Sequence, residues 1–176
     1  AYPVVRRARA VKVFPDTLKL YIYRRRPIAA AFVGSSGTTV AAVFDEEGYA
    51  VQVGGAPSSD LPVISGPDFP IPALGAQLSD GIRTVLDDLS RLNSEDPELF
   101  DLISEVRLVG KGASGFDLML YMNHVSIPIM VDRNFDAQTV RQAVLVLDVL
   151  ASESSGGIEM ADMRGGHVVF RRNEES

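Results

Sequence analysis

Apolar and polar residues alternate near the start of the chain, which is the pattern of half-buried β-strands. The alternation covers residues 11–13 and 18–23, with apolar positions at Val11, Val13, Leu18, Leu20 and Ile22. Between the two runs, Pro15 fixes φ and Asp16 can bond its own backbone, so the sequence predicts a β-hairpin. Pro27 cannot donate to a strand ladder, and we expect pairing to end or bulge there. Because two strands alone are marginally stable, this hairpin needs a surface to pack on.

A second hairpin is predicted directly afterwards. Residues 38–44 and 49–53 have the composition of strands, and the turn at 45–48 ends in a glycine that can adopt a positive φ. Prolines and glycines dominate residues 54–72 and argue against regular structure there. Large apolar residues are interleaved with them, so we expect this loop to pack over the core.

Two amphipathic helices are predicted in the middle and near the end of the chain. Apolar residues recur at helical spacing from Leu74 or Leu78 to Leu92. Pro97 opens a short helix, because proline is tolerated in a first turn. Asp136 is a good N-cap for a helix of roughly 17 residues by the same spacing rule.

The remaining apolar runs are short and separated by turns, which is typical of antiparallel strands. The predicted strands are residues 106–109, 116–122, 125–131, 158–163 and 167–171. A turn at 164–166 joins the last two into a hairpin. The fold class is therefore α+β, with a mostly antiparallel sheet and two main helices packed on it.

Charge is distributed unevenly along a chain that is globular in composition. The chain has 176 residues, of which 46% are hydrophobic and 23% charged, and its net charge is −6. Residues 1–26 contain eight basic residues and one acidic residue, a charge of +7, so the remainder carries −13. This basic end either lies near anionic lipid headgroups or is a solvated strand surface whose charge discourages aggregation. The acidic remainder and the lack of a recognition motif argue against nucleic acid.

The sequence offers little chemistry of its own. The absence of cysteine excludes disulfides and thiolate metal sites. The glycines Gly110, Gly112 and Gly115 match the dinucleotide-binding spacing, but a predicted strand follows where that motif needs a helix, so we interpret them as a hairpin loop. His124 and His167 fall in or beside turns with no ligand spacing around them. We therefore expect no enzyme activity, no cofactor and no metal.

Several short motifs occur in the order found in one family. They are the segment 14–29 with its Phe-Pro-Asp-Thr-Leu start, the Asp-x-x-Gly turn at 45–48, Leu61-Pro62, Gly66-Pro67, and the strand 158–164 with its Asp-Met-Arg end. Together they resemble the bacterial cell-division protein FtsQ/DivIB, and the segment 14–29 resembles the end of its polypeptide-transport-associated (POTRA) domain. The resemblance covers nearly the whole chain.

The resemblance implies a domain organisation and a location. Residues 1–33 would be the C-terminal hairpin of a truncated POTRA domain, 34–172 the β domain, and 173–176 a polar tail. The chain starts at Ala1 rather than Met, so we expect a fragment of a single-pass inner-membrane protein, with this part on the periplasmic side at the division septum. Such a protein is a non-enzymatic scaffold that regulates septal peptidoglycan synthesis through its partners FtsB and FtsL.

The residues themselves suggest how a partner binds. A last strand at a sheet edge leaves main-chain N–H and C=O groups unpaired, which suits the addition of a partner strand. Phe170 would anchor a pocket and Arg171 and Arg172 would meet acidic residues, unless the charges only protect a simple edge. We also expect Asp162 and Arg164 to pair. The expected partner-binding residues are Arg164, His167, Val168, Val169, Phe170, Arg171 and Arg172. The resemblance adds Lys111, which corresponds to a basic position near the same surface in the family.

Two alternatives remain at this point. One is a POTRA-containing module of an outer-membrane protein assembly or secretion system, which also binds strands by edge addition. The other is a small hydrolase, which needs a histidine or carboxylate cluster in one pocket.

Overall fold

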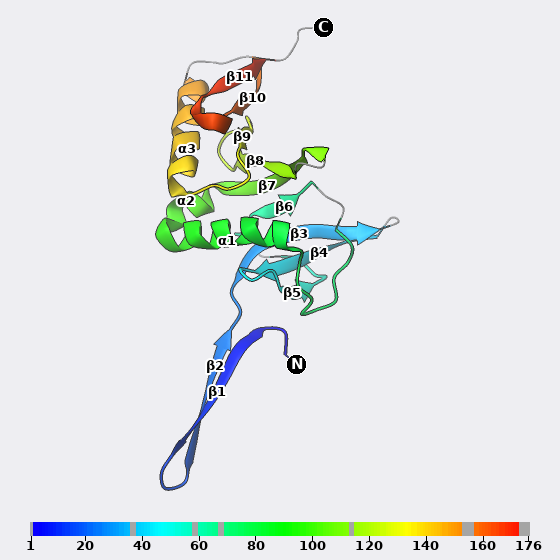
Figure 1. Ribbon diagram of the computed structural model, residues 1–176, viewed down its shortest axis with the longest axis vertical. Coiled ribbons are helices and arrows are strands. Elements are labelled where there is room, and N and C mark those ends of the chain that lie inside the picture. The colour runs from blue at the N-terminus through cyan, green and yellow to red at the C-terminus, as the bar shows by residue number, and fades with distance from the viewer. Residues whose placement is uncertain are drawn as a thin grey trace.

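The computed structural model describes residues 2–35, 38–57, 60–66, 69–112, 115–152 and 157–172. Figure 1 shows a body of strands and helices from which one long hairpin projects. The strands are β1 (Val5–Val13), β2 (Thr17–Arg24), β3 (Pro27–Ser35), β4 (Thr38–Asp45), β5 (Ala50–Val53), β6 (Val63–Ser65), β7 (Ile103–Gly110), β8 (Phe116–Met122), β9 (Ile129–Val131), β10 (Ile158–Asp162) and β11 (Val169–Arg172). The helices are α1 (Asp80–Glu95), α2 (Pro97–Asp101) and α3 (Ala137–Ser152), with a 3-10 turn η2 (Arg164–Gly166) before β11.

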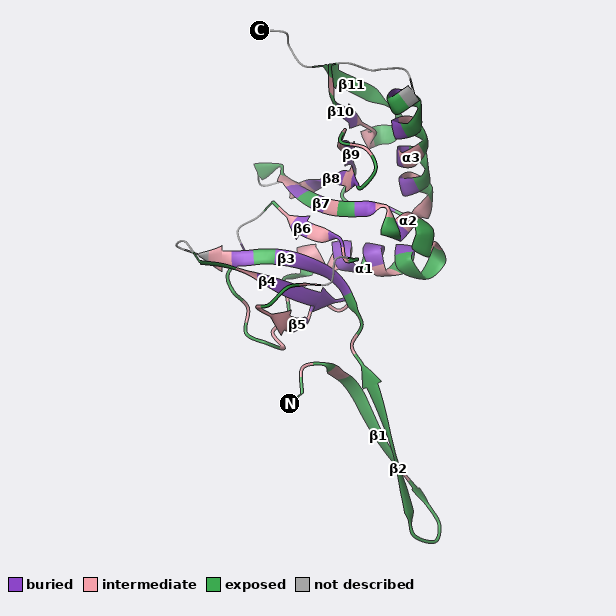
Figure 2. Ribbon diagram, turned by 180° about the vertical axis from the view of Figure 1, so that it is seen from behind, coloured by how far each residue is buried: buried purple, intermediate pink, exposed green. Residues whose placement is uncertain are grey.

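The body is built on one sheet with the strand order β11-β10-β9-β8-β7-β6-β3-β4-β5. Of the eight neighbouring pairs in the described sheet, five are antiparallel, and β3–β6, β6–β7 and β9–β10 are parallel. Helices α1 and α3 lie on the same face of this sheet (Figures 1 and 2). The predicted α+β class is therefore confirmed.

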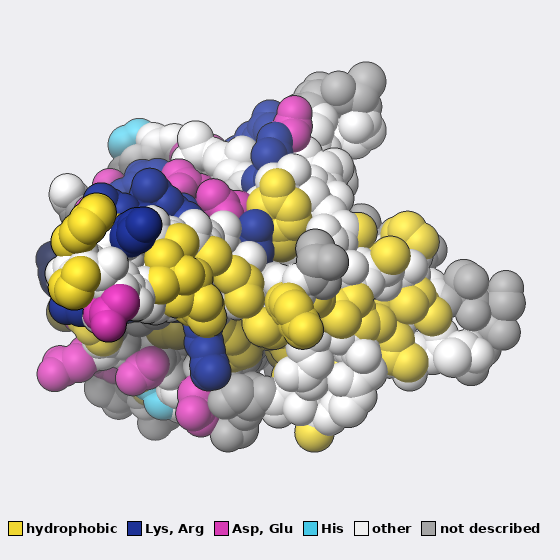
Figure 3. All heavy atoms as spheres, turned by 90° about the horizontal axis from the view of Figure 1, so that it is seen from below, with side chains coloured by type: hydrophobic (Ala, Val, Ile, Leu, Met, Phe, Trp, Pro, Cys, Tyr) yellow, Lys and Arg dark blue, Asp and Glu magenta, His cyan; other side chains and the backbone are white. Residues whose placement is uncertain are grey.

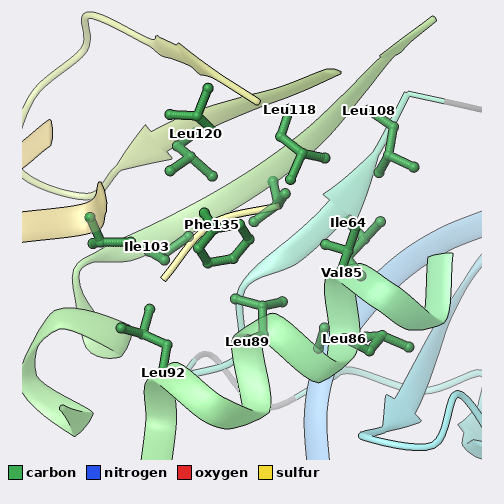
Figure 4. Close-up of a cluster of buried hydrophobic side chains, with 14 of the residues drawn as sticks. Ile64, Val85, Leu86, Leu89, Leu92, Ile103, Leu108, Leu118, Leu120 and Phe135 are labelled. Atoms are coloured by element: carbon green, nitrogen blue, oxygen red, sulfur yellow. The ribbon is translucent and has the colours of Figure 1, made fainter. Parts of the chain in front are cut away.

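The main core lies between the two helices and the sheet. Helix α1 buries an apolar stripe against the sheet, and helix α3 extends the same cluster at the other end. Figure 4 shows the α1 side chains pointing toward those of the central strands. The stripe consists of Val85, Leu86, Leu89 and Leu92, and the facing strand residues include Ile64, Leu118 and Leu120. Burial of each such side chain contributes about 1.5–3 kcal/mol to folding, so this interface is the main source of stability.

The proline-rich loop covers part of the opposite face. Ala30, Val43 and Val51 form a second buried cluster, and Leu61 from the loop packs against it. The expectation that this loop packs over the core is confirmed. The expectation that it lacks regular structure is wrong at one place, because residues 63–65 form β6 between two strands distant in sequence.

Two other boundaries differ from the sequence prediction. Helix α1 begins at Asp80 rather than at Leu74 or Leu78, because the backbone before it pairs with the β4–β5 hairpin, where Leu78 N donates to the Gly48 carbonyl over 2.9 Å. The predicted strand over 125–131 shortens to β9 at Ile129–Val131. The predicted second hairpin, short helix, last helix and final hairpin are all present.

The first hairpin, β1–β2, forms its own two-stranded sheet and projects from the body as an arm. Every residue of β2 is exposed, so the surface that this arm needs is not supplied by the described part of the chain. The arm ends at Arg24. The next strand, β3, already belongs to the large sheet from Pro27, with a bulge between Pro27 and Ala29, so the expected boundary after residue 33 falls inside a strand.

We predict that Leu89→Ala lowers the free energy of unfolding by about 2–5 kcal/mol, because it removes a fully buried side chain from the α1 stripe. Urea unfolding followed by circular dichroism measures this. Leu145→Ala on α3 is the matched control, since that side chain is 60% exposed and its loss leaves no cavity. A loss at Leu89 no larger than at Leu145 would contradict the placement of the core.

Candidate functional site

The terminal strand β11 lies at one end of the large sheet. It pairs antiparallel with β10, through Asp162 with Val169 and Ala161 with Phe170. Within the described ranges, no other segment forms backbone hydrogen bonds with it. All four of its residues are exposed, and Val169 reaches 63% exposure. The outer side of β11 thus presents main-chain groups together with apolar side chains.

The opposite end of the sheet is covered. Strand β5 is the outermost strand there, but Ala50 N donates to the Ala76 carbonyl and Gly75 N donates to the Ala50 carbonyl, both over 2.8 Å. Tyr49 and Gln77 add an isolated antiparallel bridge. The segment before α1 therefore occupies the β5 edge, and β11 is the uncovered edge of the described sheet.

Arg164 fixes the turn that leads into β11. Its guanidinium bonds both oxygens of Asp162, with Nε to Oδ1 at 2.8 Å, and its other amino group donates to Asp117 Oδ2 over 2.5 Å. The expected pairing of Asp162 with Arg164 is confirmed. Next to it, Gly165 and Gly166 have φ values of 69° and 79°, which favour glycine. The start of β11 is thereby held by both side-chain and backbone constraints.

Asp117 on β8 holds two of the predicted residues together. Lys111 Nζ lies 2.7 Å from Asp117 Oδ1, on the other side of the carboxylate from Arg164. Asp117 is 4% exposed, and burial alone would raise the pKa of its carboxylate. The hydrogen bonds and positive charges of Lys111 and Arg164 outweigh burial and lower the pKa of Asp117. Asp117 is not among the residues predicted from the sequence, where the one available signal is a lone carboxylate in the apolar run 116–122.

An apolar hollow lies beside the approach to β11. It has a volume of about 350 Å³ and is lined by Leu145 and Val146 of α3 and by Met163, His167 and Val168. Leu145 and Phe170 are both large apolar residues with exposed side chains. The structure thus places His167 and Val168 at a hollow and residues 169–172 on the open edge, while Lys111 and Arg164 meet at Asp117.

The other candidates fall elsewhere. The glycines at 110–115 join β7 to β8, and Lys111 N donates to the Gly115 carbonyl over 2.8 Å, so the interpretation as a hairpin connection is confirmed. His124 Nε2 lies 3.8 Å from Asp148 Oδ1 near the surface. Among the described residues, no group of His, Asp and Glu side chains is suited to a metal ion. None of the described helices is long and apolar enough to cross a bilayer.

A cluster of ion pairs attaches the arm to the body. Arg25, just after β2, bonds Asp45 Oδ2 at 2.5 Å and Glu47 Oε2 at 2.7 Å, and its guanidinium lies 3.9 Å from the centre of the Tyr49 ring. Arg6 adds a 2.6 Å contact with Glu46. Because Asp45 and Arg25 are both largely buried, this contact fixes the root of the arm while the rest of it stays exposed.

No protein-family model and no curated protein matches the chain. Among solved structures, the chain is similar to the major extracytoplasmic domain of the trans isomer of the bacterial cell division protein DivIB from Geobacillus stearothermophilus. The TM-score is 0.45 and the identity 17%, over 74% of this chain and 97% of that one. A similarity of this degree does not carry function from one protein to the other.

We predict that Asp117→Asn lowers the free energy of unfolding by about 1–2 kcal/mol at pH 7, because two partly exposed cations lose their shared counter-ion. The folded pKa of Asp117 is lowered, so its contribution is present above the unfolded value of about 3.9 and is lost as pH falls through the folded value. The free energy of unfolding of the variant should therefore fall less than that of the parent chain as the pH drops below about 4. Urea titrations at a series of pH values measure both effects.

The control for this variant is Asp87→Asn, which removes an exposed carboxylate paired with Arg91. We expect it to change the free energy of unfolding by under about 0.5 kcal/mol. If Asp117→Asn and Asp87→Asn change the free energy of unfolding equally, both at pH 7 and below about pH 4, Asp117 does not hold the turn before β11.

Proposed function

We propose that this chain is the extracytoplasmic part of a non-enzymatic, single-pass inner-membrane division protein of the FtsQ/DivIB kind. In this role it binds a strand of a partner on β11 and links that partner to septal peptidoglycan synthesis. The observation that carries the proposal is the uncovered edge of β11, set against a β5 edge that the chain itself covers. An edge of this kind offers a row of main-chain donors and acceptors to an extended segment.

The positions of the family-like motifs support the proposal. The Phe-Pro-Asp-Thr motif forms the turn of the arm, the Asp-x-x-Gly motif forms the turn from β4 to β5, and Leu61-Pro62 leads into β6. The residues 158–164 form β10 and the turn that sets the start of β11. The motifs therefore coincide with turns and strands that help to set the strand order of the sheet. Each motif thus has a role in the fold.

The side chains around β11 define the chemistry of the partner. Val169 and Phe170 present apolar surface beside the main-chain groups, and Arg171 and Arg172 are exposed at the end of the strand. A suitable partner segment is extended, carries apolar residues at alternate positions and has acidic residues near one end. An FtsB-type segment fills this role in our proposal, with FtsL reached through it. Lys111 and Arg164 act on the same site chiefly by fixing the turn before β11.

The arm fits a place at the end of a POTRA domain. One face of the arm carries Leu18, Leu20 and Ile22, all more than half exposed, and the remainder of such a domain would cover it. In this proposal the POTRA part ends with the arm and its exit, and the β domain consists of the large sheet and its helices. The tail 173–176 lies outside the described residues.

Depletion of the gene in its own host tests the division role directly. We expect cells to form filaments without septa, because the partner and the synthases it brings no longer assemble at midcell. Normal septation together with a defect in outer-membrane assembly would instead support the POTRA-module alternative and reject the division role.

We predict that Val169→Pro weakens binding of an FtsB-type segment at least about tenfold, since one lost docking hydrogen bond is worth about 1.4 kcal/mol. Adjacent residues of a strand direct their N–H groups to opposite sides, so Phe170→Pro is tested in parallel. One of the two variants removes an N–H that faces outward, and the other removes one that faces β10. Calorimetric titration measures the affinity, and circular dichroism verifies the fold.

Val169→Thr is the matched control for these variants, because it keeps the main-chain N–H and the β-branched side chain at an exposed position. We expect it to bind within about threefold of the parent chain. Full affinity in both proline variants, with the fold intact, would rule out strand addition at β11.

A further inference from the structure

The arm has two chemically different faces. Residues paired across an antiparallel ribbon lie on the same side of it. On one side, Arg7 pairs with Tyr23, Arg9 with Tyr21, and Val11 with Lys19. On the other side, Ala8 pairs with Ile22 and Ala10 with Leu20. One face is therefore cationic and aromatic, and we call Arg7, Arg9, Lys19, Tyr21 and Tyr23 the cationic face. The other is mainly aliphatic, with a single cation, Lys12, paired with Leu18 near the tip.

The cations of this face have no acidic partner among the described residues. The arm carries a single carboxylate, Asp16, which accepts a hydrogen bond from Thr17 at the tip. The acidic residues at its root are already engaged by Arg6 and Arg25. Figure 3, which views the molecule from the arm end, shows basic side chains gathered there with apolar side chains directly beside them. The positive charge of the arm is thus available to an external anion.

We propose that the cationic face of the arm lies on a bilayer surface that contains anionic phospholipid. Basic side chains near such a surface are attracted to it, and tyrosine is enriched at the level of the lipid headgroups. At the root of the arm, a hollow of about 810 Å³ is lined by basic residues and also by two carboxylates, Asp45 and Glu46. Arg25 and Arg6 pair with these carboxylates, so Arg7, Arg24 and Arg26 are the lining cations left to meet headgroup phosphates. This surface rests on the proposed membrane location but not on partner binding at β11.

The charge of the body favours the same orientation. Outside residues 1–26 the chain carries −13, so an anionic bilayer repels the body while it attracts the arm. The aliphatic face stays turned away from the lipid, where it remains available to the rest of its own domain. A soluble acidic protein would satisfy the cations equally well, but it gives no role to the two tyrosines that alternate with them.

Vesicle flotation of the chain tests this proposal. The vesicles contain phosphatidylcholine with about 30% phosphatidylglycerol, or phosphatidylcholine alone, in about 50 mM salt. We expect the chain, despite its net charge of −6, to float with the anionic vesicles only. Binding should disappear at about 0.5 M salt, where the Debye length falls to about 4 Å. Equal flotation with neutral vesicles, or binding that survives this salt, would overturn the proposal.

Charge-reversal variants locate the surface. We expect the double variant Arg7→Glu/Arg9→Glu to lower partitioning at least about tenfold. The matched control is Arg133→Glu/Arg141→Glu, which changes the net charge equally at two exposed positions of the body and should reduce partitioning less than about threefold. Equal losses in both variants would show a net-charge effect and reject the cationic face.

A tryptophan reporter gives an independent measurement, because the chain contains no tryptophan. The variant Tyr23→Trp should show a blue-shifted emission with anionic vesicles, since the indole enters the headgroup region. Phe32→Trp, at an exposed position of the body, should not. A shift at Phe32 and none at Tyr23 would reject the proposed orientation. Because partner binding at β11 is measured without lipid, failure here leaves that proposal untouched, and the reverse also holds.

Discussion

The large sheet is continuous only because of three residues at its centre. Strand β6 pairs in parallel with β3 on one side and with β7 on the other, through Val63 and Ile64. It joins the meander β3–β4–β5 to the strands from β7 onward, and Ile64 is buried beneath α1. Without this strand, two smaller sheets would each expose a further edge, and one helix would have to cover both. The core of α1 and the continuity of the sheet therefore depend on each other.

Continuity of the sheet determines which of its strand edges stay unpaired. One continuous sheet has only two outer strands, and the chain covers β5 with the segment that leads into α1. The remaining edge, β11, starts from a turn held by Arg164, whose anchor Asp117 lies on β8, two strands inward from β10. The position of the open edge is thus set by backbone pairing and by one buried carboxylate, rather than by the sequence of β11 itself.

Local sequence patterns predict most of the helices and strands of this fold, but not how strands distant in sequence pair with one another. The alternation of apolar residues predicts both early hairpins, and helical spacing and an N-cap at Asp136 predict α3, because these signals lie within one element. Strand β6 escapes prediction because three residues between a proline and a glycine carry no periodicity, and both of its partners are distant in sequence. Asp117 is missed partly for the same reason. Lys111 meets it across the β7–β8 connection, but Arg164 reaches it only after β8, β9 and β10 have paired.

The arm and the open edge lie at opposite ends of the molecule (Figure 1). If the arm rests on a membrane, the body stands off from the bilayer, and β11 is the part of the described sheet that lies far from it. A partner anchored in the same membrane can reach β11 only with a segment that spans this distance before it becomes a strand. The acidic body favours such a separation, because repulsion from anionic lipid keeps the open edge accessible to a polypeptide and away from headgroups. The charge distribution would then orient the molecule on the membrane, while backbone pairing alone determines which strand edge faces a partner.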